Sequence, residues 1–267
     1  MEVRHLACLL VCLLKTGQAV QTVFEYDSQS LTSVPDSISS ELVELSLVYN
    51  LITQISQADF NDKYPDLKTL SFSDNKISFV ESGCFKGTQL LFINLENNLL
   101  TNFPDFHEVN NTLLAVYVTS NAITKISEEE INYLTNLKYL HLAENPIVSL
   151  PDLPMNLPAL QYLELTGISF HCCSGIAWIR RESEITIDTD TYPCNSQSKW
   201  TSSSLQDITE EMLLNEPCAV NGEYSTRGAE SMLVFNIEYS SDILIYQLVE
   251  QYQLGLRRLD KGYMATC

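Results

Sequence analysis

Residues 137–147 read Leu-Lys-Tyr-Leu-His-Leu-Ala-Glu-Asn-Pro-Ile, with leucines at the first, fourth and sixth positions and an asparagine at the ninth. Leu140 and Leu142 alternate with Tyr139 and His141, so a short strand here would place leucines on one face and polar or aromatic side chains on the other. One such strand cannot bury its apolar face alone. The pattern therefore requires copies of itself stacked on both sides.

Those copies are present, and their first positions follow one another at intervals of 25, 23, 23, 24 and 23 residues. Five copies carry the asparagine in phase, whereas Ile168 replaces it in the last copy. The six copies begin at Leu42, Leu67, Leu90, Leu113, Leu137 and Leu160, and a degenerate copy upstream contains Phe24, Tyr26, Gln29 and Leu31. A stack of repeats is thus expected to occupy most of the chain.

The pattern resembles the leucine-rich repeat family, whose repeats are about 20 to 29 residues long. The resemblance covers roughly residues 22–218. It implies an α/β solenoid, a horseshoe with short parallel strands on its concave face. It also implies that the repeated asparagines hydrogen-bond the backbone of neighbouring turns, because a buried amide left unpaired costs about 1–3 kcal/mol. These structural asparagines are Asn50, Asn75, Asn98, Asn121 and Asn145. Phe60, Phe85 and Ile131 share a later repeat position and are expected to form a second apolar row on the convex side.

Five segments are expected along the chain. Residues 1–19 resemble a secretory signal peptide, because a basic start precedes the apolar run Leu6–Leu14 and small residues end at Ala19. That run is too short to span a bilayer, which takes about 20 apolar residues. The other segments are a cysteine-free N-terminal cap with the degenerate repeat (20–41), the repeats (42–168), a disulfide-bonded C-terminal cap (169–218) and a C-terminal extension (219–267) with a strand at 232–239 and an amphipathic helix from Asp242.

The cap segment contains four cysteines, and its stretch from Phe170 to Ile179, with Trp178 after an adjacent cysteine pair, resembles the C-terminal cap of extracellular leucine-rich repeat proteins. The resemblance implies pairing of Cys172 with Cys194 and of Cys173 with Cys218, although the sequence alone leaves the pairing open. Adjacent cysteines point apart, so a disulfide cap is favoured over a metal site that would include His171.

Three further residues stand out. Cys84, inside a repeat, is expected to be a buried, inert thiol. Cys267, the last residue, is a candidate for an intermolecular disulfide and so for a covalent dimer, or for pairing with Cys84. Asn110 begins the sequon Asn-Asn-Thr in a loop before a strand, which predicts glycosylation there.

The charge of the chain restricts its partners. The formal net charge is −19 at pH 7, and removal of residues 1–19 would make it −20. Such a surface repels nucleic acid and anionic membrane and favours cationic partners or divalent ions, although solubility alone is the simpler interpretation. No glycine-rich phosphate loop, nucleophile elbow or zinc-protease motif is present. The sequence therefore predicts no enzyme, no cofactor, no metal site and no membrane insertion.

The third, fifth and seventh positions of the repeats face solvent on the predicted sheet, and lysine and arginine are absent from them. In the later repeats these positions gather aromatic side chains with acidic neighbours, which is typical of a protein-binding surface. The candidate ligand-binding residues are Phe92, Tyr117, Tyr139, His141 and Tyr162, with Glu96, Glu144 and Glu164 around them. The alternative is that the aromatic residues only stabilise the sheet by pairing across strands.

The resemblance and this surface together predict a secreted or cell-surface, non-catalytic module that binds a protein or peptide on its concave sheet. A cell-surface position would then come through a partner. Two alternatives remain open. One is a structural protein of the extracellular matrix, against which the absence of an N-terminal cysteine cluster counts. The other is the ectodomain of a membrane receptor whose anchor is not in this chain.

Overall fold

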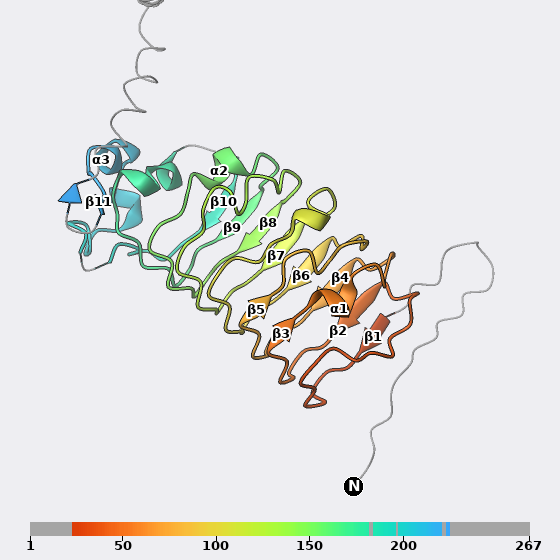
Figure 1. The fold of residues 1–267 in the computed structure, drawn as a ribbon. Coiled ribbons are helices and arrows are strands. Elements are labelled where there is room, and N and C mark those ends of the chain that lie inside the picture. The colour runs from red at the N-terminus through yellow and green to blue at the C-terminus, as the bar shows by residue number, and fades with distance from the viewer. Residues whose placement is uncertain (1–22, 182–183, 196, 221–222, 225–267) are drawn as a thin grey trace, which may run out of the picture. The chain divides into compact units, whose positions relative to one another are not determined.

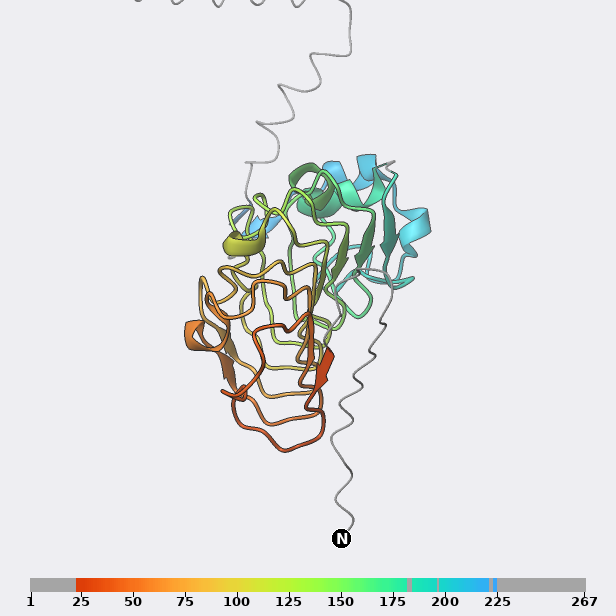
Figure 2. The ribbon, with the colours of Figure 1, turned by 90° about the vertical axis from the view of Figure 1, so that its right-hand side faces the viewer.

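The computed structural model describes residues 23–181, 184–195, 197–220 and 223–224. The chain divides into two compact units, residues 1–216 and residues 217–267. The described part of the first unit is an elongated stack of repeats with a parallel sheet along one wall and loops and short helices along the other (Figures 1 and 2). The predicted α/β solenoid with short parallel strands is confirmed.

The sheet has eight strands in the described residues, and each pairs in parallel with the next repeat's strand. The strands are β1 (Val23–Glu25), β2 (Glu44–Ser46), β4 (Thr69–Ser71), β6 (Phe92–Asn94), β7 (Ala115–Tyr117), β8 (Tyr139–His141), β9 (Tyr162–Glu164) and β10 (Thr186–Asp188). The fourth position of each repeat, for example Leu140, pairs directly with the fourth position of its neighbours. Every strand pair of this sheet keeps the same register.

The core is built from the same repeat positions throughout. Leu137, Leu140, Leu142 and Ile147 occupy the first, fourth, sixth and eleventh positions of the organising repeat, and each is at most 1% exposed. Equivalent residues of the other repeats are buried in the same way. Fully burying such a side chain contributes roughly 1.5–3 kcal/mol. Stacked repeats thus share one continuous apolar interior.

The convex wall carries a second apolar row. Short elements line it: β3 (Gln54–Ile55) paired with β5 (Phe79–Val80), the helices α1 (Gln57–Phe60) and α2 (Leu153–Asn156), and the 3-10 turn η1 (His107–Val109). Phe60, Phe85 and Ile131 are buried there, as the sequence predicted. Phe85 also stacks on Phe106, with 5.9 Å between ring centroids. Phe106 was not predicted as part of this row, because it does not share the others' repeat position.

The asparagine ladder is formed as predicted. Asn145 Nδ2 donates to the carbonyls of Val118, Leu142 and Ala143, and its Oδ1 accepts from the Ile123 N–H of the previous repeat. Asn50, Asn75, Asn98 and Asn121 make the corresponding bonds in their own repeats. Each amide therefore ties two neighbouring repeats together while all its polar atoms stay paired.

The residue just before each of these asparagines has a positive φ. Glu144 has a φ of 54°, and the equivalent positions of the other repeats hold Ser28, Tyr49, Asp74, Asn97, Ser120 and Gly167. Glycine suits this left-handed conformation best. At Gly167 an added Cβ would also lie 3.1 Å from Glu144 Cγ. The left-handed turn thus lies between the end of each strand and the asparagine position of the same repeat.

The C-terminal end of the first unit is covered by short helical segments. These are η2 (Ser174–Arg180), η3 (Leu205–Asp207) and α3 (Glu210–Leu214). Cys172 and Cys194 form a disulfide with a Cα–Cα distance of 5.3 Å, which is the pairing that the family resemblance implies. Cys173 and Cys218 are also disulfide-bonded, and their pairing with each other stays a prediction. Trp178 and Trp200, both within the cap segment, are buried.

The described part of the second unit includes Cys218 and an antiparallel pair, β11 (Ala219–Val220) and β12 (Glu223–Tyr224). Several predictions fall outside the described residues: the signal peptide at 1–19, the strand at 232–239, the helix from Asp242, and the role of Cys267. The described stretches contain no helix with the length and apolar character that crossing a bilayer requires.

Candidate binding surface on the parallel sheet

Five side chains on β6 to β9 form what we call the aromatic patch: Phe92, Tyr117, Tyr139, His141 and Tyr162. All five occupy the third or fifth position of their repeats, so the pleat points them away from the core. Phe92 and Tyr139 are each 38% exposed. All five residues therefore lie on the solvent-facing side of the sheet, as their repeat positions predicted.

Three rings of the aromatic patch contact one another in a row. The His141 ring stacks on Tyr117, with centroids 4.3 Å apart and planes inclined by 27°. On its other side, His141 lies 5.1 Å from the Tyr162 ring, centroid to centroid. Aromatic pairs at such distances contribute about 0.5–1.5 kcal/mol beyond area burial. The stack makes this part of the sheet surface rigid, and rigid aromatic groups make effective anchors for a partner.

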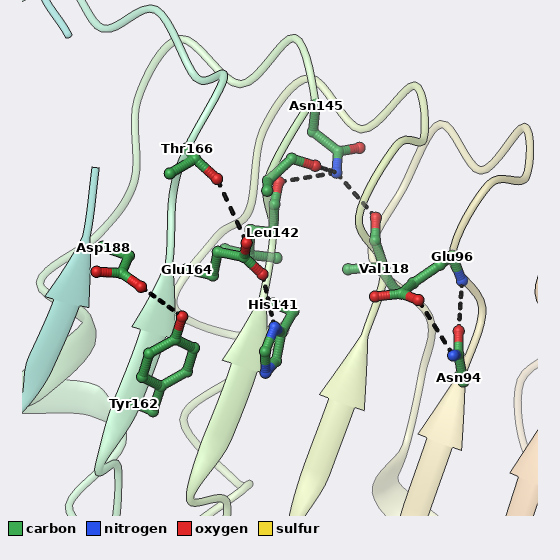
Figure 3. A network of polar contacts seen from close by, with 11 residues as sticks. Asn94, Glu96, Val118, His141, Leu142, Asn145, Tyr162, Glu164, Thr166 and Asp188 are labelled. Carbon is green, nitrogen blue, oxygen red and sulfur yellow. Dashed lines mark hydrogen bonds and ion pairs between the residues drawn. The ribbon is translucent and has the colours of Figure 1, made fainter. Parts of the chain in front are cut away.

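Two carboxylates hold this stack in place (Figure 3). Glu164 Oε2 lies 2.6 Å from His141 Nδ1, across the β8–β9 pair. The Tyr162 hydroxyl donates to Asp188 Oδ2 at 2.6 Å, across the β9–β10 pair. The two rings are thus fixed both by stacking and by polar contacts, which reduces the entropy that they would lose on binding a partner.

A third carboxylate lies at the other end of the aromatic patch. Glu96 follows β6, where its Oε2 accepts from Asn94 Nδ2 at 3.2 Å and its backbone N–H donates to Asn94 Oδ1 at 2.8 Å (Figure 3). Glu96, Glu164 and Asp188 therefore border the aromatic patch from both ends along the stack. The contacts keep their side chains close to the sheet.

The phenol groups of Tyr117 and Tyr162 remain neutral at physiological pH, because the pKa of each is raised. The hydrogen bond to Asp188, with smaller effects of desolvation and nearby carboxylates, raises the pKa of Tyr162 from 10.0 to about 12. Desolvation, followed by the charge of Glu96, raises the pKa of Tyr117. The surface thus combines neutral aromatic hydroxyls with negative carboxylates.

The remaining predicted acidic residue differs from the others. Glu144 lies in the left-handed turn after β8, where it accepts a hydrogen bond from the Ser120 hydroxyl at 2.6 Å. Its side chain is exposed and makes no hydrogen bond to the stacked rings in the described structure. Glu96 and Glu164 lie beside the aromatic patch, whereas Glu144 is part of a turn.

Asp188 is the residue at this surface that the sequence interpretation missed. Its strand, β10, lies inside the cap and lacks the leucine pattern. A signal was nevertheless present, because Ile187 follows Leu163 by 24 residues, close to the repeat length, and the two are paired. Alternation of Ile185, Thr186, Ile187 and Asp188 also fits a strand.

Other reactive side chains in the described residues offer no competing site. Cys84 is a free, fully buried thiol, and burial raises its pKa, so it is protonated and inert as predicted. His107 lies on the convex wall, where it stacks on Tyr133 and contacts Asp105. Asp105 in turn accepts from the Ser82 hydroxyl. The described residues contain no group of three or more side chains suited to a metal ion.

The predicted glycosylation site lies away from the aromatic patch. Asn110 directly follows η1 on the convex wall and is half-buried, and the Thr112 hydroxyl of the same sequon donates to the Val109 carbonyl. A glycan at Asn110 would leave the sheet face open. Its attachment stays a prediction.

Fold and surface together define a repeat solenoid whose exposed sheet carries the candidate site. Comparison with known proteins agrees: a family model described as leucine rich repeat matches residues 40–100 and 111–167. Residues 40–100 and 111–167 are thus leucine-rich repeats, and a disulfide-bonded cysteine segment follows them.

The chain is also similar to several proteins of this kind. Asporin from Bos taurus is 29% identical over 143 residues, which cover 53% of this chain and 36% of asporin. Tsukushi from Gallus gallus is 31% identical over 129 residues, 47% of this chain and 34% of Tsukushi. Mimecan from Gallus gallus is 26% identical over 216 residues, 78% of this chain and 63% of mimecan. The matches thus span about a third of the first two relatives.

Asporin, lumican and mimecan are extracellular leucine-rich repeat proteins, which supports an extracellular location in general terms. They are also non-enzymatic, in agreement with the absence of catalytic motifs from the sequence.

Proposed function

We propose that this chain is a secreted or cell-surface, non-catalytic recognition protein that binds a protein or peptide through the aromatic patch on its sheet. The observation that carries the proposal is the stack of Tyr117, His141 and Tyr162, which Glu164 and Asp188 fix on a sheet face that the described residues leave uncovered. Similarity to extracellular leucine-rich repeat proteins supports the same class of function.

The geometry favours binding over a purely structural role for these aromatic residues. Cross-strand pairing would explain rings that cover one another. It does not explain Phe92 and Tyr139, which are each 38% exposed and have no aromatic ring contact in the described structure. Large, partly exposed aromatic side chains beside a rigid stack are typical of the residues that dominate binding energy at interfaces.

The test begins with recovery of ligands from extracellular fluid on the intact secreted chain. Direct binding of the recovered, purified ligand is then measured for the wild type and for Y117A, Y139A and Y162A. Each substitution is expected to weaken binding by about tenfold or more, since central aromatic anchors contribute at least 1–2 kcal/mol. The matched control is Y192A, because Tyr192 is 61% exposed but lies outside the strands. Unchanged affinity in all three patch variants, with folding intact, would remove the proposal.

A receptor ectodomain is the second candidate function. It is favoured by similarity to a protein described as a probable glycoprotein hormone G-protein coupled receptor from Anthopleura elegantissima, 31% identical over 124 residues, 13% of that protein. A transcript from the same gene that encodes a long apolar segment after Cys218 would support this candidate. Size-exclusion of the secreted chain with and without reductant tests separately whether Cys267 links two copies covalently.

A further inference from the structure

Resting on the proposed function, we infer that the ligand presents an extended segment with two basic side chains about four to six residues apart. In this arrangement the segment crosses the strands along the stack of repeats. One basic side chain contacts Glu96, and the other contacts Glu164 and Asp188. The residues between them lie on the aromatic patch.

The carboxylates of this surface make no ion pair with lysine or arginine in the described residues. Glu96 is paired with an amide, Asp188 with a phenol and Glu164 with the His141 ring and the Thr166 hydroxyl. The ion pairs that lysine and arginine make in the described residues lie elsewhere: Lys86 with Asp62, Arg181 with Asp152 and Lys199 with Glu216. Lysine and arginine of the described residues therefore do not neutralise the negative charge on the sheet.

Basic residues are also missing from the exposed sheet positions around these carboxylates. The third, fifth and seventh repeat positions hold no lysine or arginine from β1 to β10. The nearest in sequence are Lys68 and Lys138, each one residue before its strand. A ligand that covered this face without supplying positive charge would desolvate the carboxylates uncompensated, at a considerable free-energy cost. Charge complementarity thus selects a cationic partner.

The aromatic side chains between the carboxylates suit the same partner. Lysine and arginine side chains lay their alkyl stems along apolar surface while the charged end reaches an acceptor. Their cationic ends are also attracted to the faces of tyrosine and phenylalanine rings. Tyr139 and Phe92, at the third position of β8 and β6, offer such faces on the same side of the sheet as Glu96 and Glu164. The aromatic and the acidic residues of this surface therefore both favour a ligand with lysine or arginine side chains.

The spacing of the two basic side chains follows from the repeat geometry. Glu96 belongs to the repeat of β6. Glu164 lies on β9, three strands further along the sheet, and Asp188 lies on β10, four strands from β6. Neighbouring strands lie about 4.8 Å apart, so the distance across the strands is roughly 14 Å from β6 to β9 and roughly 19 Å from β6 to β10. An extended chain advances about 3.3 Å per residue. Two basic residues four to six positions apart would therefore reach both acidic ends at once.

The experiment uses synthetic peptides and the intact secreted protein. Each labelled peptide contains two arginines separated by two, five or ten positions, with alternating threonine and valine elsewhere to favour an extended chain. A fourth peptide has both arginines replaced by glutamate. We expect the five-position peptide to bind about tenfold more tightly than either other spacing, and the glutamate peptide not to bind. Equal affinity for all three arginine spacings would overturn the inference.

Charge variants provide the second arm. The double variant E96Q/E164Q keeps side-chain shape and is expected to weaken binding of the five-position peptide about tenfold and to abolish the spacing preference. The matched control is E128Q/E129Q, which removes the same charge from exposed residues outside the sheet. An equal loss in both double variants would show a non-specific effect of net charge, and unchanged affinity in E96Q/E164Q would show no role for these carboxylates. Either outcome would overturn the inference.

The two proposals can fail separately. If the tyrosine variants lose affinity for the recovered ligand while E96Q/E164Q binds it normally, the binding surface stands and the cationic segment is wrong. If neither set of variants changes affinity for that ligand, both proposals are wrong.

Discussion

The first three strands of the sheet and the later strands β6 to β9 have the same backbone and different outer surfaces. In the fifth repeat position, β1, β2 and β4 place Glu25, Ser46 and Ser71, which are small or acidic. The same position of β7 and β8 holds Tyr117 and His141, which stack on each other. Inward positions are leucine-like in both regions. The comparison shows that one set of positions maintains the fold, while another is free to specify a partner.

Core substitutions should affect both regions alike, and they give the largest expected effect. Leu45 and Leu140 occupy the same inward position and are 1% and 0% exposed. Replacement of either by alanine is expected to lower the free energy of unfolding by about 3 kcal/mol, because the lost apolar contacts leave a cavity. Urea denaturation followed by circular dichroism measures it. A loss confined to one region would show that the repeats are not equivalent.

The asparagine ladder predicts a smaller but similarly uniform effect. Asn75 and Asn145, one in each region, bond the carbonyls of their own and the preceding repeat. Alanine at either position leaves buried backbone groups unpaired, and should cost about 2 kcal/mol of unfolding free energy. The urea midpoint reports the loss, with N132A as the control because Asn132 is exposed on the convex side. Equal stability of N145A and N132A would contradict the ladder's role.

Outer substitutions should separate the two regions. F92A is expected to weaken ligand binding about tenfold, or roughly 1.4 kcal/mol, through loss of an exposed anchor. T69A, at the paired position of the neighbouring strand β4, should leave affinity unchanged. Both variants should unfold within about 1 kcal/mol of the wild type. Isothermal titration with the recovered ligand measures affinity, and comparable loss in T69A would mean that binding extends over the first strands.

The titration of Tyr162 gives the finest test. Its pKa is raised from 10.0 to about 12, mainly by its hydrogen bond to Asp188. A raised folded-state pKa of an acid means that the neutral form is favoured by folding. This contribution to stability is complete below pH 10 and is lost as the pH rises through about 12. Ultraviolet difference titration of the wild type and D188N should show one tyrosine pKa returning towards 10. An unchanged titration curve would exclude the bond.

Much of the fold was predictable because a strict repeat period fixes register. Once Leu140 and Leu163 are recognised as equivalent, the outward positions of Tyr139 and Tyr162 follow from strand pleating alone. The asparagine bonds were predictable for the same reason, since a buried amide needs partners.

Other features have no such periodic signal. The left-handed turns hold residues as different as Tyr49, Asp74 and Gly167, so composition does not mark them. Phe106 reaches the convex row from a different repeat position. Asp188 was missed because β10 keeps the spacing but loses the leucines. The contacts of Tyr162 with Asp188 and of His141 with Glu164 also depend on side-chain rotamers, which the pattern does not specify.

The two ends of the stack are stabilised differently, and this difference predicts the end from which unfolding begins. At one end, β10 lies within a cap that the disulfide between Cys172 and Cys194 cross-links. At the other, β1 pairs only with β2 in the described structure. Because each repeat is stabilised mainly by its immediate neighbours, unfolding by tension or heat should begin at the N-terminal repeat. The repeats nearest this disulfide, which carry the candidate site, would then be the last to unfold.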